Sequence, residues 1–316
     1  MIEEAKSIKV RVPILRQKKN MKSDDKQYSH QLDSLISLYA EACEWLGELG
    51  IAYSKNRYGL YKQHFDKFTA LANGSIAPKI EDLLGFKKKF DNAYLEINQL
   101  VRIYDNLKGV DSGEFIEQVR RVASGQEFRA NSENDQARDF LFELSIASRF
   151  IKAGYSTSLT GICDVVVDLL DEGTLFVECK RIRSQSKIGV NIKKASKQIS
   201  SRMEHKVSSK IFGLIAINVT DLLPDSNMLT PSSMQAGIAM HRAISQNFIR
   251  TNLDEIGSGS RGKSLGVMCV SEMMTHLMLD SNVPGLFYSR HTGFIPYTKS
   301  KLLETLAPKI SNQDII

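Results

Sequence analysis

Three side chains that could act together lie in two short apolar segments of the sequence. Asp164 stands in the first, at 161–169, and Glu178 and Lys180 stand in the second, at 174–182. Both segments are rich in valine and other apolar residues and are predicted strands. Residues two apart in a strand point to the same face, so Glu178 and Lys180 share one.

A turn between the two strands would bring the three side chains together. The residues Asp-Glu-Gly-Thr at 171–174 predict a β-hairpin. If the turn centres near residues 171 and 172, the antiparallel register places Asp164 opposite or diagonal to the pair in the second strand, within about 5 to 8 Å at Cβ. The sequence therefore predicts a small cluster of two carboxylates and one amine.

Such a cluster suits phosphodiester chemistry. Mg²⁺ is a hard cation that takes one or two protein carboxylates and completes its octahedron with water and phosphate oxygen, so Asp164 and Glu178 are predicted metal ligands. Lys180 adds a compact positive charge. It could orient and help deprotonate an attacking water, or stabilise the charge that grows on the phosphorane-like transition state.

The series Asp164, then Glu178-Cys179-Lys180, resembles the PD-(D/E)xK phosphodiesterase superfamily, which includes many restriction enzymes, junction resolvases and repair nucleases. Cys163 occupies the place of the proline in the motif. The resemblance implies a restriction-endonuclease-like αβββαβ core with a mixed sheet. It also implies an endonuclease that uses Mg²⁺, for which Mn²⁺ can substitute, and that cleaves DNA rather than RNA, although the sequence excludes neither.

Members of this superfamily typically carry a glutamate on the helix before the sheet, and Glu143 matches that place in a predicted helix at 136–153. Its neighbours Phe140, Ala147 and Phe150 form an apolar stripe that should face the core. A carboxylate in such a stripe needs a partner, because burying one unpaired is costly. Glu143 is therefore a predicted catalytic residue that would support the metal directly or through water.

The segment that follows the predicted lysine strand is strongly basic. Residues 180–210 contain ten lysines and arginines and one acidic residue, Glu204, a net charge of +9 in a chain whose total is +6. A helix is predicted at about 190–206, and superfamily members tend to carry a basic helix that faces the nucleic acid. A positive stripe beside a metal site would bind a phosphate backbone. The predicted nucleic-acid-binding residues are Arg181, Arg183, Lys193, Lys194, Lys197, Gln198 and Arg202.

The period of the apolar residues divides the chain into regions. Residues 1–27 form a predicted basic arm, and residues 28–123 show three- and four-residue steps that predict an all-helical domain with its aromatic residues in the core. Polar, turn-forming residues at 124–136 mark a boundary. The predicted nuclease-like domain, 124–316, continues after the basic helix with a strand at 211–219, a helix at 232–250, a strand at 265–270 and a hairpin at 287–297.

Composition limits the class of protein. With 316 residues and 42% hydrophobic content, the chain can bury its own core. Four cysteines without CxxC spacing and six histidines without zinc-ligand spacing predict neither a disulfide framework nor a zinc site. With no apolar leader or membrane-length apolar stretch, we expect a cytoplasmic protein whose partner is nucleic acid and not a membrane. A homodimer would suit double-strand cleavage, but no residue demonstrates one.

Two other interpretations stay open. The same fold could serve as a non-catalytic nucleic-acid-binding or regulatory protein. A nucleotide hydrolase is suggested by residues 257–264, which match the phosphate-loop pattern GxxxxGK[ST] with Lys263 as its lysine. A phosphate loop must follow a strand and open a helix, whereas here a helical segment precedes and a strand follows, which favours a linker. His241 and His276 have no identifiable nucleophile or carboxylate partner and are assigned to packing or to the surface.

Overall fold

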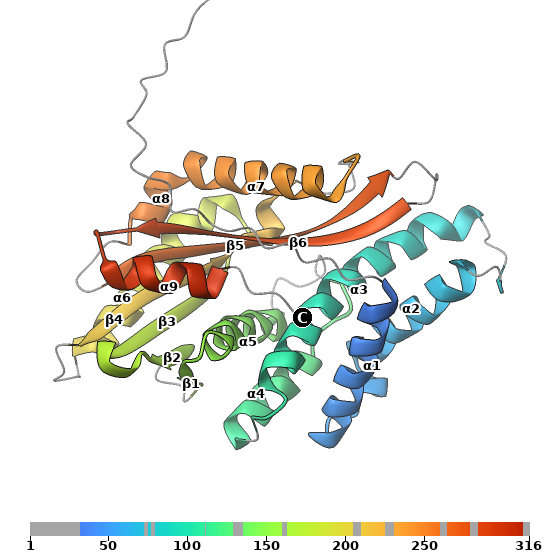
Figure 1. Ribbon diagram of the computed structural model, residues 1–316, viewed down its shortest axis with the longest axis horizontal. Helices are drawn as coiled ribbons and strands as arrows, with labels where there is room; N and C mark the ends of the chain where they lie inside the picture. Colours follow the sequence, from blue (N-terminus) through green and yellow to red (C-terminus); the bar gives the residue numbers. More distant parts are fainter. Residues whose placement is uncertain are drawn as a thin grey trace, which may run out of the picture.

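The computed structural model describes residues 32–72, 75–76, 80–110, 112–128, 135–159, 163–204, 210–224, 231–259, 264–278 and 284–311. They form a helical region and a six-stranded mixed sheet with helices on both faces (Figure 1). The predicted mixed α/β class is confirmed. The predicted basic arm at 1–27 lies outside the described residues, as do Gly262 and Lys263. No described helix combines the length and the apolar character that a membrane crossing needs.

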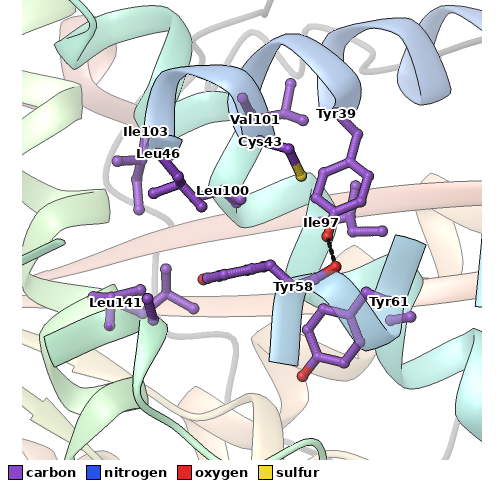
Figure 2. Packing of buried hydrophobic residues seen from close by; sticks show 14 of the residues in the cluster. Tyr39, Cys43, Leu46, Tyr58, Tyr61, Ile97, Leu100, Val101, Ile103 and Leu141 are labelled. Carbon is purple, nitrogen blue, oxygen red and sulfur yellow. Dashed lines mark hydrogen bonds between the residues drawn. The ribbon is translucent and has the colours of Figure 1, made fainter. Parts of the chain in front are cut away.

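The helical region comprises α1 (Leu32–Glu48), α2 (Arg57–Ala72), α3 (Ile80–Leu107) and α4 (Gly113–Ala123). Its apolar residues recur at helical spacing and meet in one core (Figure 2). Tyr58 and Tyr61 are fully buried there, and Tyr39 Oη donates a hydrogen bond to the carbonyl oxygen of Tyr58. The assignment of these aromatic residues to packing is confirmed.

The sheet has the strand order β1-β2-β3-β4-β5-β6. Its central pairs β3–β4 and β4–β5 run parallel, and the outer pairs β1–β2, β2–β3 and β5–β6 run antiparallel. Parallel neighbours require a crossover, which α6 supplies between β3 and β4, and α7 with α8 between β4 and β5. The elements of this region are α5 (Gln136–Lys152), β1 (Ser156–Ser158), β2 (Val165–Asp168), β3 (Thr174–Arg181), α6 (Ile188–Glu204), β4 (Ile211–Asn218), α7 (Met234–Thr251), α8 (Leu253–Gly257), β5 (Ser264–Met278), β6 (Pro284–Pro296) and α9 (Lys301–Ser311).

Helices cover both faces of the sheet and so decide what each strand residue meets. α5 and α9 pack over one face, in a core cluster that includes Cys179. α6 and α8 pack over the other, in a cluster that includes Ile182. Because strand side chains alternate between faces, Glu178 and Lys180 lie on the α6 face and Cys179 on the α5 face. The prediction that Cys179 is a core residue is confirmed.

Helix α5 joins the two regions. Its Leu141 packs into the core of the helical region (Figure 2), while other residues of the same helix pack on the sheet. Buried ion pairs add to this packing: Glu96 Oε1 of α3 lies 2.6 Å from Arg138 Nε of α5, and Glu96 Oε2 lies 3.4 Å from Arg57 Nη1. Arg138 also pairs with Asp135, the N-cap residue of α5. These contacts hold α5, which carries Glu143, against both regions.

The β2–β3 hairpin has the register expected from the sequence. Val165 pairs with Val177 and Asp168 with Thr174, so the turn centres on residue 171. Gly173 closes the turn with φ +117°, a conformation that favours glycine, and a Cβ there would come within 2.1 Å of the Lys210 carbonyl oxygen. The register places residue 164 level with residue 178, one step beyond the last pair.

Two features of the C-terminal part differ from the expectations. The strand predicted at 265–270 extends as β5 to Met278 and pairs with β6 along its length. Its polar Glu272 breaks the apolar pattern, but Gln99 of α3 donates a hydrogen bond to that buried carboxylate. Helix α9 was not predicted, although Leu303, Leu306 and Ile310 stand at helical spacing and are buried.

Candidate active site

The carboxyl end of β3 brings together the three residues that the sequence singled out. Lys180 Nζ lies 3.1 Å from Glu178 Oε2 and 3.7 Å from Asp164 Oδ2. The Glu178 side chain is completely buried, whereas Lys180 and Asp164 keep 18% and 21% of their side-chain surface exposed. The predicted convergence of Asp164 with Glu178 and Lys180 is therefore present, and solvent reaches it from the side of Asp164 and Lys180.

Asp164 is positioned by the backbone of the neighbouring strand. It precedes the first residue of β2, so the strand predicted from 161 begins at Val165 in the described residues. In place of a strand hydrogen bond, Asp164 Oδ2 accepts one from the backbone N–H of Cys179 at 2.7 Å. This bond fixes one oxygen of Asp164 beside the Glu178 and Lys180 pair.

Arg202 of α6 completes the surroundings of Glu178. It forms a close ion pair with Glu178 Oε1, so each carboxylate oxygen of Glu178 has its own cation. Residue 178 lies on the sheet face that α6 covers, which is why a residue of that helix reaches it. A fully buried carboxylate requires such compensation, because an unpaired buried charge is costly.

Glu143 approaches the same cluster from α5. Burial raises the pKa of its carboxyl group to about 8, and the negative charge of Asp164 adds to this rise while Lys180 opposes it. Glu143 therefore lies within electrostatic reach of both residues and carries a proton at neutral pH. Its half-buried position agrees with the apolar stripe seen in the sequence.

The net charge of Glu143, Asp164, Glu178, Lys180 and Arg202 is compatible with binding of a divalent cation. With Glu143 protonated, the charges of Asp164 and Glu178 cancel those of Lys180 and Arg202. A divalent cation and an ionised Glu143 would bring the sum to +1, which complements one phosphodiester. The available donors are carboxylate oxygens, the ligands that Mg²⁺ prefers. No three histidine, cysteine, aspartate or glutamate side chains form an ion cage in the described part of the chain, so water and phosphate would have to complete the coordination.

Two arginines that the sequence assigned to nucleic acid are held elsewhere. The Arg181 side chain is 3% exposed, with its Nε 2.8 Å from Asp221 Oδ2 and its Nη1 3.9 Å from Asp139 Oδ1. Arg183 Nη2 lies 3.1 Å from Asp139 Oδ2 and donates a hydrogen bond to the carbonyl of Asp135. Arg181 therefore does not present its charge to solvent as expected. At the end of β3 its side chain lies between Asp139 of α5 and Asp221, which follows β4.

Fewer of the predicted basic residues are available to a phosphate backbone than the net charge of residues 180–210 suggested. Lys193, Lys194 and Lys197 are exposed on α6 and keep the arrangement expected of a phosphate-binding face. Gln198 lies one turn before Arg202, and its Oε1 is buried with no hydrogen-bond partner among the described residues. Arg202, which the sequence placed with the stripe, is engaged with Glu178 instead.

Sequence reasoning overlooked Asp139, which pairs with Arg183 one helical turn before Glu143. The signal was its spacing of four residues from Glu143 on a predicted helix. It also found no partner for His276, whose Nε2 lies 3.4 Å from Asp91 Oδ1. His241 is a packed residue as predicted: it is buried, with hydrogen bonds to the hydroxyls of Ser289 and Ser271.

The surroundings of the phosphate-loop pattern are those of a linker. Helix α8 ends at Gly257, and β5 begins at Ser264, so a helix precedes the pattern and a strand follows it. This is the reverse of the order that a phosphate loop requires. The context predicted from the sequence is confirmed.

Comparisons with known proteins leave the site to be interpreted from its own residues. No protein-family model matches the sequence. Searches of curated proteins and of solved structures gave no significant match either.

Proposed function

We propose that the protein is a metal-dependent nuclease that hydrolyses phosphodiester bonds in nucleic acid, with DNA as the favoured substrate. One observation carries the proposal: Lys180 Nζ lies within 3.7 Å of carboxylate oxygens from both Asp164 and Glu178, at a partly exposed strand end. Two carboxylates and a lysine on adjacent strands are the groups that the PD-(D/E)xK resemblance calls for.

The order of elements supports the same proposal. From α5 the chain continues through β1, β2 and β3 to α6 and β4, a helix, three strands, a helix and a strand. This is the αβββαβ order of the restriction-endonuclease-like core. Glu143 on the first helix and Lys193, Lys194 and Lys197 on the second stand on the elements where that core would need them.

The residues of the cluster and the exposed lysines of α6 each have a role in this proposal. Asp164 and Glu178 would hold Mg²⁺ or Mn²⁺, which when bound supplies a Lewis acid that polarises a phosphoryl oxygen and lowers the pKa of water. Lys180 would orient the attacking water and stabilise negative charge on the phosphate. Glu143, with its raised pKa, can hold or release a proton near neutral pH beside Asp164. The exposed lysines of α6 would bind the backbone.

A second function has an observation in its favour. Both oxygens of Glu178 already have a cationic partner, Lys180 at one and Arg202 at the other, so a metal ion at Glu178 would have to share the carboxylate with them or displace one. A non-catalytic nucleic-acid-binding protein on the same fold would keep both pairs permanently. The two functions differ in their dependence on a divalent cation.

A cleavage assay separates them. Plasmid DNA and labelled DNA and RNA oligonucleotides are incubated with Mg²⁺, with Mn²⁺ or with EDTA, using the wild type, D164A and K180A. We expect cleavage with either metal, none with EDTA, and a loss of at least roughly 100-fold in each variant, the size typical of removing one catalytic group. D171N is the control, since it removes an exposed carboxylate from the same hairpin.

Two outcomes would reject the proposal. If binding persists but no metal supports cleavage of any substrate, the non-catalytic function is correct. If a further variant, K263A, loses the activity and K180A does not, the activity depends on the phosphate-loop pattern, as the nucleotide-hydrolase interpretation expects.

A further inference from the structure

A groove of about 390 Å³ opens between the end of α4 and the start of α5. Its lining includes Arg121, Ser124, Gln126, Gln136 and Phe140. The chain just after α4 approaches α5 closely here, because a Cβ on residue 125 would come within 2.6 Å of the Ala137 Cβ. The nuclease proposal leaves the groove without a role.

The groove lies beside the candidate active site. Phe140 stands on α5 between Asp139, which pairs with Arg183, and Glu143. Asp139 Oδ1 also lies 3.9 Å from Nη1 of Arg181, the residue that follows Lys180, so the start of α5 meets the end of β3. A strand of nucleic acid with its phosphate at Lys180 could therefore place an adjacent nucleotide in the groove.

The lining has the chemistry that an unpaired base requires. The Phe140 ring is half-buried. The Arg121 guanidinium carbon lies 5.3 Å from the centroid of that ring, so an aromatic ring and a guanidinium group are in contact in the lining. Bases stack on both kinds of surface. The exposed amides of Gln126 and Gln136 offer donors and acceptors to base edges.

The charges around the groove are compatible with a polyanion. Asp135, the acidic residue among the described residues of the lining, is buried and paired with Arg138. Arg121 Nε lies 3.3 Å from Glu117 Oε1 in an exposed ion pair. Because exposed ion pairs are weak, a phosphate can displace Glu117 and bind Arg121. The size also limits the occupant: 390 Å³ is at the lower end of the range for ligand pockets, about 300 to 1,000 Å³, which suits one nucleotide and not a base pair.

We propose that this groove binds a single unpaired nucleotide next to the cleaved phosphate, with its base against Phe140 and Arg121. The inference rests on the proposed nuclease function and narrows its substrate to single-stranded nucleic acid or to duplexes with an extrahelical nucleotide. Phe140 is then a specificity residue.

Binding without cleavage provides the test. The full chain is titrated in EDTA with a fluorescent single-stranded oligonucleotide and with the corresponding blunt duplex. We expect the wild type to bind the single strand more tightly. Stacking on an aromatic side chain is worth about 1–3 kcal/mol per base, so F140L should weaken single-strand binding by roughly 5- to 150-fold and duplex binding little. F140Y, which keeps an aromatic ring, should restore the affinity.

Arg120 provides a matched control for Arg121. Both arginines lie on α4, both pair with Glu117, and their side chains are 54% and 51% exposed, but Arg120 does not line the groove. We expect R121Q to weaken single-strand binding more than R120Q does. Equal losses in R120Q and R121Q would overturn the inference. So would tighter duplex binding by the wild type, or an F140L variant that loses both ligands equally or neither.

A parallel cleavage assay with Mg²⁺ separates failure of this inference from failure of the nuclease proposal. If no substrate is cleaved but F140L selectively loses the single strand, the groove assignment stands and the catalytic function falls. If the wild type cleaves and F140L keeps the wild-type preference between single strand and duplex, the groove assignment alone falls.

Discussion

The ion pair between Arg202 and Glu178 makes a sharp test of the site's electrostatics. In R202M, Glu178 stays fully buried and keeps Lys180 at one oxygen but loses its partner at the other. Removing one member of a fully buried ion pair costs about 3–5 kcal/mol. Because the Arg202 side chain is 24% exposed and Lys180 still compensates half of the charge, we expect a smaller loss of about 1–3 kcal/mol in unfolding free energy.

The divalent cation of the nuclease proposal adds a second expectation. An ion held by Glu178 would take over the charge that Arg202 leaves behind. Excess Mg²⁺ should therefore stabilise R202M more than it stabilises the wild type. A ligand that binds the folded state stabilises it, and the stabilisation is larger when the ligand binds more tightly. Urea unfolding followed by circular dichroism, in EDTA and in Mg²⁺, measures both quantities.

The control for R202M is K197M. Lys197 is an exposed cation on the same helix, so its replacement changes the net charge equally without touching Glu178. A difference between R202M and K197M below about 0.5 kcal/mol in EDTA would refute the role assigned to the ion pair, since that is the scatter of ordinary surface substitutions. An equal gain from Mg²⁺ in wild type and R202M would refute the placement of the cation at Glu178.

Three further predictions concern stability, each measured by urea unfolding. Burial lowers the pKa of His241 to about 3 and of His291 to about 4. The free energy of unfolding should therefore be independent of these histidines above about pH 6.5 and should fall below that pH by up to about 1.4 kcal/mol per pH unit for each of them. An H241Q/H291Q variant should show a shallower decrease. G173A should cost at least about 2 kcal/mol, because its Cβ meets the Lys210 carbonyl oxygen at positive φ, whereas G109A should cost little. E96Q should cost about 3–5 kcal/mol, because it removes the buried carboxylate that pairs with Arg57 and that shares Arg138 with Asp135.

Each of these has a contrary result. An unchanged acid slope in H241Q/H291Q would show that other groups control acid unfolding. A stable G173A would mean that the turn can move away from Lys210. A loss below about 1 kcal/mol in E96Q would mean that the ion pairs between α3 and α5 contribute little to holding the helical region against the sheet.

The sequence by itself determined the local part of the site. Alternation in two apolar segments and a turn sequence between them sufficed to predict the hairpin and the meeting of Asp164 with Lys180, because strand faces and hairpin register depend on neighbouring residues. The apolar stripe around Glu143 likewise predicted that this carboxylate faces the core, and it is half-buried in the structure; helical period is a local property.

Tertiary structure decided which charges meet. A count of cations could not show that Arg202 turns to Glu178 while Arg181 is enclosed by Asp139 and Asp221, because those pairs join different elements of the sheet and its helices. Because β3 and β4 are parallel, the connection between them must cross the sheet, and α6 in that connection covers the face that holds Glu178. The spacing of apolar residues within each element does not predict this crossover. Burial of polar residues follows the same rule: Glu272 becomes a core residue because α3, distant in sequence, supplies Gln99.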